Sequence, residues 1–142
     1  MKPTATDPDL ASEFLKPIGG PGSRRLRLAL VENDWQTHCV LRKIFTTLGW
    51  EVESAMTVAG GIALLDGNLD ALILDPSLPD GDGLDVLRWV RLRRLKARVV
   101  VVTEGDDPAR VAAIRQFRPD ALVRKPVELD AVIRALGTDR TG

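Results

Sequence analysis

Apolar residues along this chain gather in five short runs, separated by segments in which apolar and polar residues alternate with helical spacing. Two of the runs, residues 71–74 (ALIL) and 98–102 (RVVVV), are apolar with almost no alternation. A strand that is covered on both faces has this pattern, because neither face meets water. The runs that we interpret as strands are residues 26–31, 50–55, 71–74, 98–102 and 121–123.

The segments between the runs favour helices. Within residues 35–48, for example, Leu41, Ile44, Phe45 and Leu48 fall on one side of a helix. Residues 107–117 begin with Asp-Pro, which is typical of an N-cap followed by the first helical position. The predicted helices are residues 35–48, 57–66, 84–95, 107–117 and 128–136.

Strand and helix therefore alternate five times, and each helix can serve as the crossover between two parallel strands. This alternation predicts the α/β class, with a doubly wound, flavodoxin-like, five-stranded parallel sheet and helices on both faces. We expect the strand order 2-1-3-4-5, which is common for such sheets. Ligands bind to them at the switch point, where the carboxyl ends of strands 1 and 3 open a crevice.

The amino-terminal residues differ from the rest of the chain. Residues 1–24 hold four of the nine prolines and three glycines, a composition that sustains neither helix nor sheet. We therefore predict a flexible N-terminal tail over residues 1–24, one domain over residues 25–138 and a short C-terminal tail over residues 139–142.

Composition excludes several classes of protein. The chain carries 20 Lys and Arg against 20 Asp and Glu, so no overall basic field favours direct nucleic-acid binding. One cysteine and one histidine allow neither a disulfide framework nor a Cys/His zinc site. No apolar run is long enough to span a membrane and no signal peptide is evident, so we expect a cytoplasmic protein without membrane contact.

Polar side chains follow four of the predicted strands. Glu32 and Asn33 follow the first strand, Asp75 the third, Thr103 the fourth and Lys125 the fifth. Because the carboxyl ends of parallel strands meet at one edge of a sheet, these side chains should lie together. Buried carboxylates repel one another unless a cation intervenes, and oxygen ligands beside a phosphate are the usual surroundings of Mg²⁺. The pattern thus predicts a site for Mg²⁺ and an anion.

At these residues the chain resembles the receiver domains of two-component response regulators. The matching segments are LALVEND, DALILDPSLPDGDGLDVLRWVR, VVVVTEGDD and DALVRKP. The separations agree with the family too: 43 residues from Glu32 to Asp75, 28 from Asp75 to Thr103 and 22 from Thr103 to Lys125. No single segment is decisive, but together they form a specific match over roughly four fifths of the chain.

The resemblance implies that Asp75 is the phosphoacceptor, which receives a phosphoryl group from a histidine kinase or a histidine phosphotransfer protein. It implies that Mg²⁺ is the cofactor. The ligands that it implies are Glu32, Asn33, Asp75 and the backbone carbonyl of Ser77. The protein would then be a signalling switch that catalyses only its own phosphorylation and dephosphorylation, and not an enzyme acting on other substrates.

The resemblance also assigns Thr103 and Lys125 to the phosphoryl group. The hydroxyl of Thr103 would donate a hydrogen bond to it, and the ammonium of Lys125, aimed by a cis peptide to Pro126, would pair with it. Phosphorylation would change how the domain binds an unidentified output protein, or a second copy through the face made by residues 107–117, 121–123 and 128–136.

Three positions depart from the family pattern. The second acidic residue is replaced by Asn33, whose amide oxygen is a neutral and weaker ligand for a hard cation. Leu122 stands where the family commonly has Tyr or Phe, and Glu104 stands where a small residue is customary. These departures leave open an alternative: a pseudo-receiver that binds its partners without phosphorylation.

Other features are expected to be structural. The arginines of residues 88–98 read first as an exposed helix face, His38 as a partly exposed structural histidine and Cys39 as a buried or half-buried small residue. A phosphatase that uses Asp75 as nucleophile would need a second Asp where Ser77 stands. The chain ends soon after the last predicted helix, which fits a stand-alone receiver or phosphorelay protein, and equally a receiver from a longer chain.

Overall fold

The computed structural model describes residues 24–137; residues 1–23 and 138–142, which hold most of the predicted N-terminal tail and all of the C-terminal tail, lie outside the described residues. Five strands form one parallel sheet in the order β2-β1-β3-β6-β7, which confirms the predicted order 2-1-3-4-5. The strands are β1 (Arg27–Val31), β2 (Glu51–Ala55), β3 (Ala71–Leu74), β6 (Arg98–Thr103) and β7 (Ala121–Arg124). Each boundary lies within one residue of the predicted run.

Four helices connect these strands, a fifth follows β7, and all five are shorter than predicted. They are α2 (Trp35–Thr47), α3 (Val58–Ala63), α4 (Leu84–Leu92), α5 (Pro108–Gln116) and α6 (Leu129–Leu136). Helix α4 ends early because Arg94 adopts a left-handed conformation, with φ of 54°, so the N–H of Leu95 turns back to the carbonyl of Val90. None of the described helices has the length and apolarity needed to cross a membrane.

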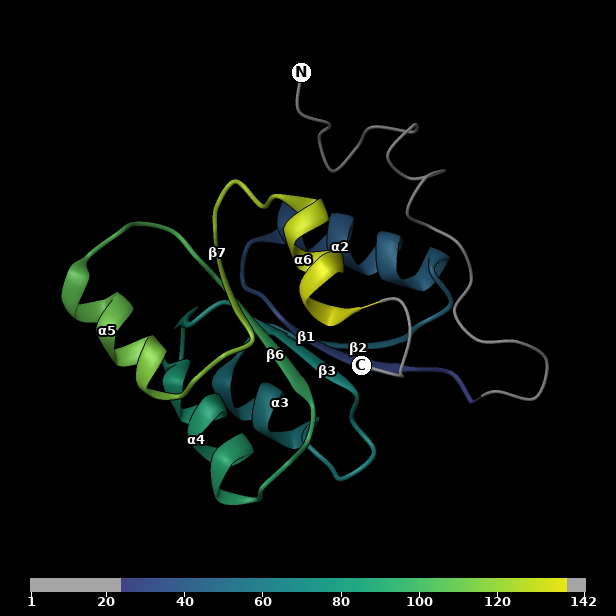
Figure 1. Cartoon of the computed structure of the whole chain (residues 1–142), viewed down its shortest axis with the longest axis horizontal. Coiled ribbons are helices and arrows are strands. Elements are labelled where there is room, and N and C mark those ends of the chain that lie inside the picture. Colours follow the sequence, from purple (N-terminus) through teal and green to yellow (C-terminus); the bar gives the residue numbers. More distant parts are fainter. Residues whose placement is uncertain (1–23, 138–142) are drawn as a thin grey trace.

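Both faces of the sheet are covered, as its apolar strands predict (Figure 1). In β1, Leu28 and Leu30 pack with buried residues of α2 and α6, whereas Ala29 and Val31 pack with buried residues of α3, α4 and α5. Successive side chains of a strand point to opposite faces, so one continuous apolar run supplies two cores.

The environments of His38 and Cys39 are the reverse of the prediction. His38 is buried, with its ring 5.7 Å from that of Trp35 and its Nδ1 atom 3.4 Å from the carbonyl oxygen of Glu32. Cys39 is exposed. Neighbouring residues of a helix point about 100° apart, so a core face that includes His38 and Leu41 turns Cys39 toward solvent.

A short loop after β3 brings the chain back against itself. It contains the two-residue strands β4 (Ser77–Leu78) and β5 (Gly81–Asp82), which were not predicted, and it ends at Gly83, the N-cap of α4. The N–H of Gly83 donates to the carbonyl of Pro76 at 2.9 Å. A Cβ atom on Gly83 would lie only 2.5 Å from the Cα atom of Pro76, so no side chain fits here.

We therefore expect Gly83→Ala to lower the free energy of unfolding by about 1–3 kcal/mol, because backbone atoms must move to admit the methyl group. Urea denaturation would measure this loss. Gly67→Ala is the matched control, since a Cβ atom on Gly67 meets no atom within 4 Å. Equal stability of the two variants would contradict the steric explanation.

Candidate functional site

The predicted site residues lie at the carboxyl ends of the strands. Glu32 directly follows β1, Asp75 follows β3, Thr103 ends β6 and Lys125 follows β7. Backbone hydrogen bonds extend the sheet past the strand ends: the N–H of Asp75 donates to the carbonyl of Val31 at 2.8 Å, and that of Lys125 to the carbonyl of Thr103 at 2.9 Å. The hydrogen bonding of the sheet thus fixes the backbone positions of Asp75 and Lys125.

Lys125 joins the two carboxylates. Its Nζ atom lies 2.7 Å from Oε1 of Glu32 and 2.9 Å from Oδ2 of Asp75. Glu32 is fully buried and Asp75 is 5% exposed. Water screens charge poorly at this depth, so the attraction between the ammonium and each carboxylate is strong. The structure therefore brings Glu32, Asp75 and Lys125, which are far apart in sequence, into one cluster.

Burial and these contacts change the pKa values of the cluster. Burial raises the pKa of Glu32 to about 7, although the hydrogen bonds from Lys125 and from the N–H of Asp34 act in the opposite direction. Burial by itself lowers the pKa of Lys125, but its hydrogen bonds to Glu32 and Asp75 outweigh this effect and raise it. Lys125 is therefore a cation at neutral pH.

A backbone N–H binds Asp75, and Thr103 lies at the end of the adjacent strand β6. The N–H of Ser77 donates to Oδ1 of Asp75 at 2.9 Å, which holds the carboxylate against the following turn. Thr103 is buried, and its hydroxyl makes only a long contact of 3.4 Å with the carbonyl of Glu104. The Glu104 side chain is exposed. The peptide bond between Lys125 and Pro126 is cis, as the resemblance implied.

The residues after Glu32 take separate roles. Asp34 is the N-cap of α2: its carboxylate accepts hydrogen bonds from the side chain and the N–H of Thr37, and these bonds lower the pKa of Asp34. Asp34 is thus engaged in capping and does not replace the missing second acid. Asn33 is exposed beside Glu32.

The donor set fits a hard divalent cation in part. Oε2 of Glu32 is buried and has no hydrogen-bond partner, and two buried carboxylates share a single ammonium, so the cluster keeps an excess negative charge. Within residues 24–137, however, no group of three or more His, Cys, Asp or Glu residues is arranged to hold a metal ion. The two further oxygen donors that the resemblance assigns to the ion, the amide of Asn33 and the carbonyl of Ser77, are neutral.

No role for Arg110 beside the site was predicted from the sequence. This residue of α5 donates to Oδ1 of Asp82 at 2.9 Å and to the carbonyl of Pro76 at 3.3 Å. It thereby ties the first turns of α5 to the residue that directly follows Asp75. Only topology brings these groups together, since 28 residues separate Arg110 from Asp82.

The fold and the cluster define a doubly wound α/β domain with an acidic, lysine-bearing site at the switch point of its sheet. Residues 28–137 match the response regulator receiver domain family, so the chain belongs to that family. It is 34% identical over 129 residues to the photosynthetic apparatus regulatory protein RegA of Rhodobacter capsulatus, covering 89% of this chain and 67% of that one. It is 35% identical over 125 residues to the response regulator protein PmrA of Pseudomonas aeruginosa, covering 82% and 55%.

The chain spans between about half and two thirds of the length of these curated relatives. Solved structures show the same fold. The non-phosphorylated HemR receiver domain from Leptospira biflexa aligns with a TM-score of 0.73 and 22% identity, covering 83% of this chain and 99% of that one. A CheY-like receiver domain protein from Methanospirillum hungatei aligns with a TM-score of 0.71 and 24% identity, covering 80% and 94%.

The raised pKa of Glu32 predicts a pH-dependent stability. The carboxyl titrates near 4.5 in the unfolded chain and near 7 in the folded protein, so the folded state binds more protons between these values and the free energy of unfolding falls as pH rises. Glu32→Gln removes this titration. We expect the stability of the variant relative to the natural protein to rise by about 2–3 kcal/mol across this window.

Urea denaturation at a series of pH values in a chelating buffer would measure this difference. Glu51→Gln, which removes an exposed carboxylate from β2, is the matched control and should show no such slope. If the difference in the free energy of unfolding between Glu32→Gln and the natural protein did not change with pH, Glu32 would be charged across the whole pH range tested.

Proposed function

We propose that this receiver domain is a phosphorylation switch in which Asp75 accepts a phosphoryl group from a histidine kinase or a histidine phosphotransfer protein. The observation that supports the proposal best is the ammonium of Lys125, at 2.7 Å from Glu32 and 2.9 Å from Asp75. A cation in this position suits both the free carboxylate and the more highly charged phosphate that would replace it.

In the proposed transfer, a carboxylate oxygen of Asp75 attacks the phosphorus atom of a phosphoimidazole. The P–N bond breaks, the imidazole nitrogen takes up the electron pair, and an acyl phosphate forms. Lys125 balances the charge on the phosphoryl oxygens, and the hydroxyl of Thr103, which has only a long contact at present, donates to one of them. Water that later attacks the acyl phosphate restores Asp75.

We propose Mg²⁺ as the cofactor of this site. Glu32, Asp75 and the carbonyl of Ser77 would hold the ion, with the amide of Asn33 in place of the usual second carboxylate. Bound Mg²⁺ neutralises charge on the phosphoryl oxygens during transfer. The unpartnered oxygen of Glu32 and the excess negative charge of the cluster support this assignment.

The output of the switch is proposed to lie in α5 and its neighbours. Ile114 is the one fully buried residue of α5, and the polar contacts of Arg110 add to its packing. A charge change at Asp75 would act on the adjacent carbonyl of Pro76, which accepts from Arg110. The binding of an output protein, dimerisation through α5, β7 and α6, and the cytoplasmic location all stay predictions.

The phosphoacceptor is tested by incubating the full chain with acetyl phosphate and Mg²⁺ and weighing it intact. We expect a gain of one phosphoryl mass, and Asp75→Asn should abolish it because an amide does not form the acyl phosphate. Asp85→Asn removes an exposed carboxylate of α4 and should leave the gain unchanged. No mass gain in the natural protein would favour the pseudo-receiver.

The departure at Asn33 predicts weakened metal binding that can be restored. Asn33→Asp should tighten Mg²⁺ binding about tenfold or more, because it adds a charged oxygen ligand. Trp35 is 65% exposed and stacks on His38 next to Glu32, so its fluorescence should report the titration. Trp35→Phe identifies its part of the signal. If Asn33→Asp binds Mg²⁺ no better than the natural protein, position 33 is not a ligand.

A further inference from the structure

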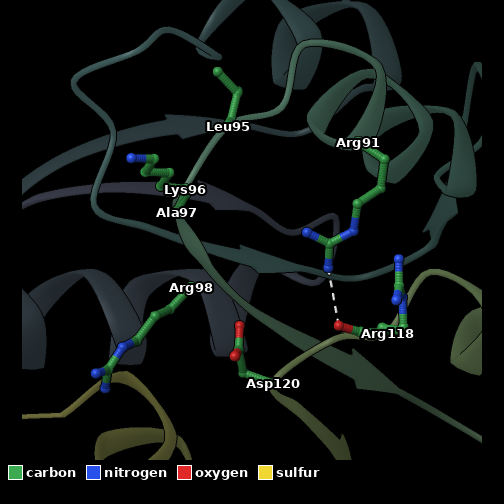
Figure 2. Close-up of a pocket in the computed structure, with 7 residues that line it drawn as sticks. All are labelled: Arg91, Leu95, Lys96, Ala97, Arg98, Arg118 and Asp120. Carbon is green, nitrogen blue, oxygen red and sulfur yellow. Dashed lines mark hydrogen bonds between the residues drawn. The ribbon is translucent and has the colours of Figure 1, made fainter. Parts of the chain in front are cut away.

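The end of the sheet opposite Asp75 carries a hollow that is lined by basic side chains. Its volume is about 360 Å³, and it lies between the end of α4 and the starts of β6 and β7 (Figure 2). Its lining residues are Arg91, Leu95, Lys96, Ala97, Arg98, Arg118 and Asp120. We call the four cations of this set, Arg91, Lys96, Arg98 and Arg118, the basic groove.

The basic groove is anchored but not neutralised. Arg91 donates from Nε to the carbonyl of Phe117 at 2.8 Å and from Nη2 to that of Arg118 at 2.9 Å, and Arg98 donates to the carbonyl of Leu136 at 3.2 Å. Carbonyl groups carry no net charge, so both guanidinium groups keep their full charge while losing mobility. Among residues 24–137, no salt bridge joins any cation of the groove to a carboxylate.

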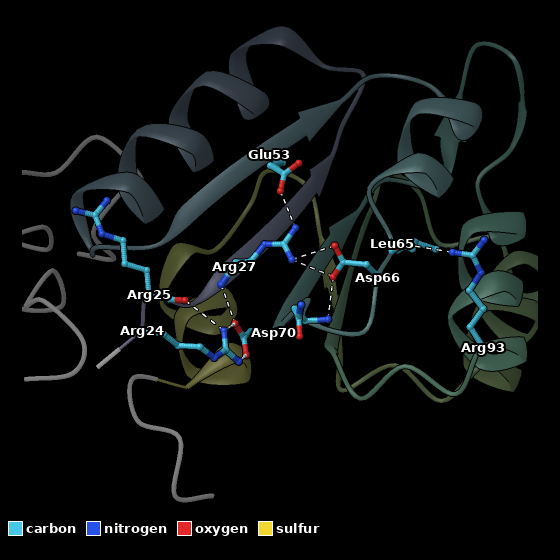
Figure 3. A network of polar contacts seen from close by, with 9 residues as sticks. Arg24, Arg25, Arg27, Glu53, Leu65, Asp66, Asp70 and Arg93 are labelled. Carbon is cyan, nitrogen blue, oxygen red and sulfur yellow. Dashed lines mark hydrogen bonds and ion pairs between the residues drawn. The ribbon is translucent and has the colours of Figure 1, made fainter. Parts of the chain in front are cut away.

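The neighbouring part of this sheet end is different. A second hollow of about 340 Å³ shares Lys96 and Arg98 with the first and continues toward Arg24. The additional cation of this hollow is paired, since Arg24 binds Asp70 at 2.8 Å, and nearby Arg27 binds Glu53 and Asp66 (Figure 3). Among the residues that line the basic groove, by contrast, Asp120 is the single carboxylate, and it already accepts from the N–H of Val99.

We propose that the basic groove binds the polyphosphate group of a small ligand. Four cations and one carboxylate leave a formal charge that suits several phosphoryl groups better than one. Arg91 and Arg118 lie on one side of the start of β6, and Lys96 and Arg98 extend on the other (Figure 2). A chain of phosphoryl groups offers several charged oxygens to such a set of cations, and guanidinium groups bind phosphate through parallel hydrogen bonds.

The lining disfavours two other anionic partners. A bound acidic peptide needs apolar pockets for its anchoring side chains, and here the apolar lining is limited to Leu95 and Ala97. Duplex DNA is gripped by elements that project into a groove or follow the backbone, whereas these cations surround a hollow on a chain with zero net charge. The site is separate from Asp75 and does not depend on the proposed phosphorylation.

The test is calorimetric titration of the full chain with tripolyphosphate at low ionic strength, without divalent cations. We expect saturable binding with one ligand per chain, and weaker binding of orthophosphate. Lys96→Gln combined with Arg118→Gln should weaken tripolyphosphate binding about tenfold or more, because both side chains are exposed and their loss removes two of the four cations. Thermal unfolding followed by circular dichroism would verify that the double variant folds.

The matched control is Arg42→Gln combined with Lys43→Gln, which removes two exposed cations from α2 and should leave the affinity unchanged. Absence of saturable binding, or an equal loss in the control, would overturn the proposal. A parallel titration uses a short DNA duplex at the same phosphate concentration. Tighter binding of the duplex, lost in the Lys96 and Arg118 double variant, would assign the groove to nucleic acid instead.

Discussion

One ammonium group shared by two buried carboxylates is the constraint on which the carboxyl end of this sheet depends. Lys125 follows the edge strand β7, whereas Glu32 and Asp75 follow the neighbouring strands β1 and β3, so the two ion pairs tie together three strands that are far apart in sequence. When Glu32 is ionised, one cation does not balance the two carboxylates. The remaining charge and the unpartnered oxygen of Glu32 make this end of the molecule receptive to a further cation.

The topology and the position of the cluster could be predicted because both follow from short-range patterns. Strands β3 and β6 are apolar without alternation, and a sequence of this kind is stable only between two layers of helices. Once parallel strands alternate with helices, every carboxyl end lies at one edge. The polar residues after each strand then meet without any further information, which is why Glu32, Asp75 and Lys125 could be grouped from sequence.

Contacts that depend on the exact path of loops and on helix rotation could not be predicted. Arg110 binds Asp82 and the carbonyl of Pro76 because the β3–α4 loop folds back toward α5, and no local pattern marks either partner. The predicted environments of His38 and Cys39 were wrong because a single polar position within an amphipathic helix does not determine which neighbour faces the core. Arginines such as Arg91, which hold backbone carbonyls, resemble solvated charges in the sequence for the same reason.

Leu122 occupies the position at which the receiver family commonly has an aromatic residue. Leu122 is partly buried against the cluster that α4 and α5 share, and it has no polar atom that a phosphoryl group or Thr103 could engage. Arg110 supplies a connection of another kind: it reaches from α5 to the peptide carbonyl next to Asp75. Ile114 is the one fully buried residue of α5, so the contacts of Arg110 with Asp82 and Pro76 supplement its packing against the core. In this chain a guanidinium group therefore links α5 to the peptide carbonyl that follows Asp75.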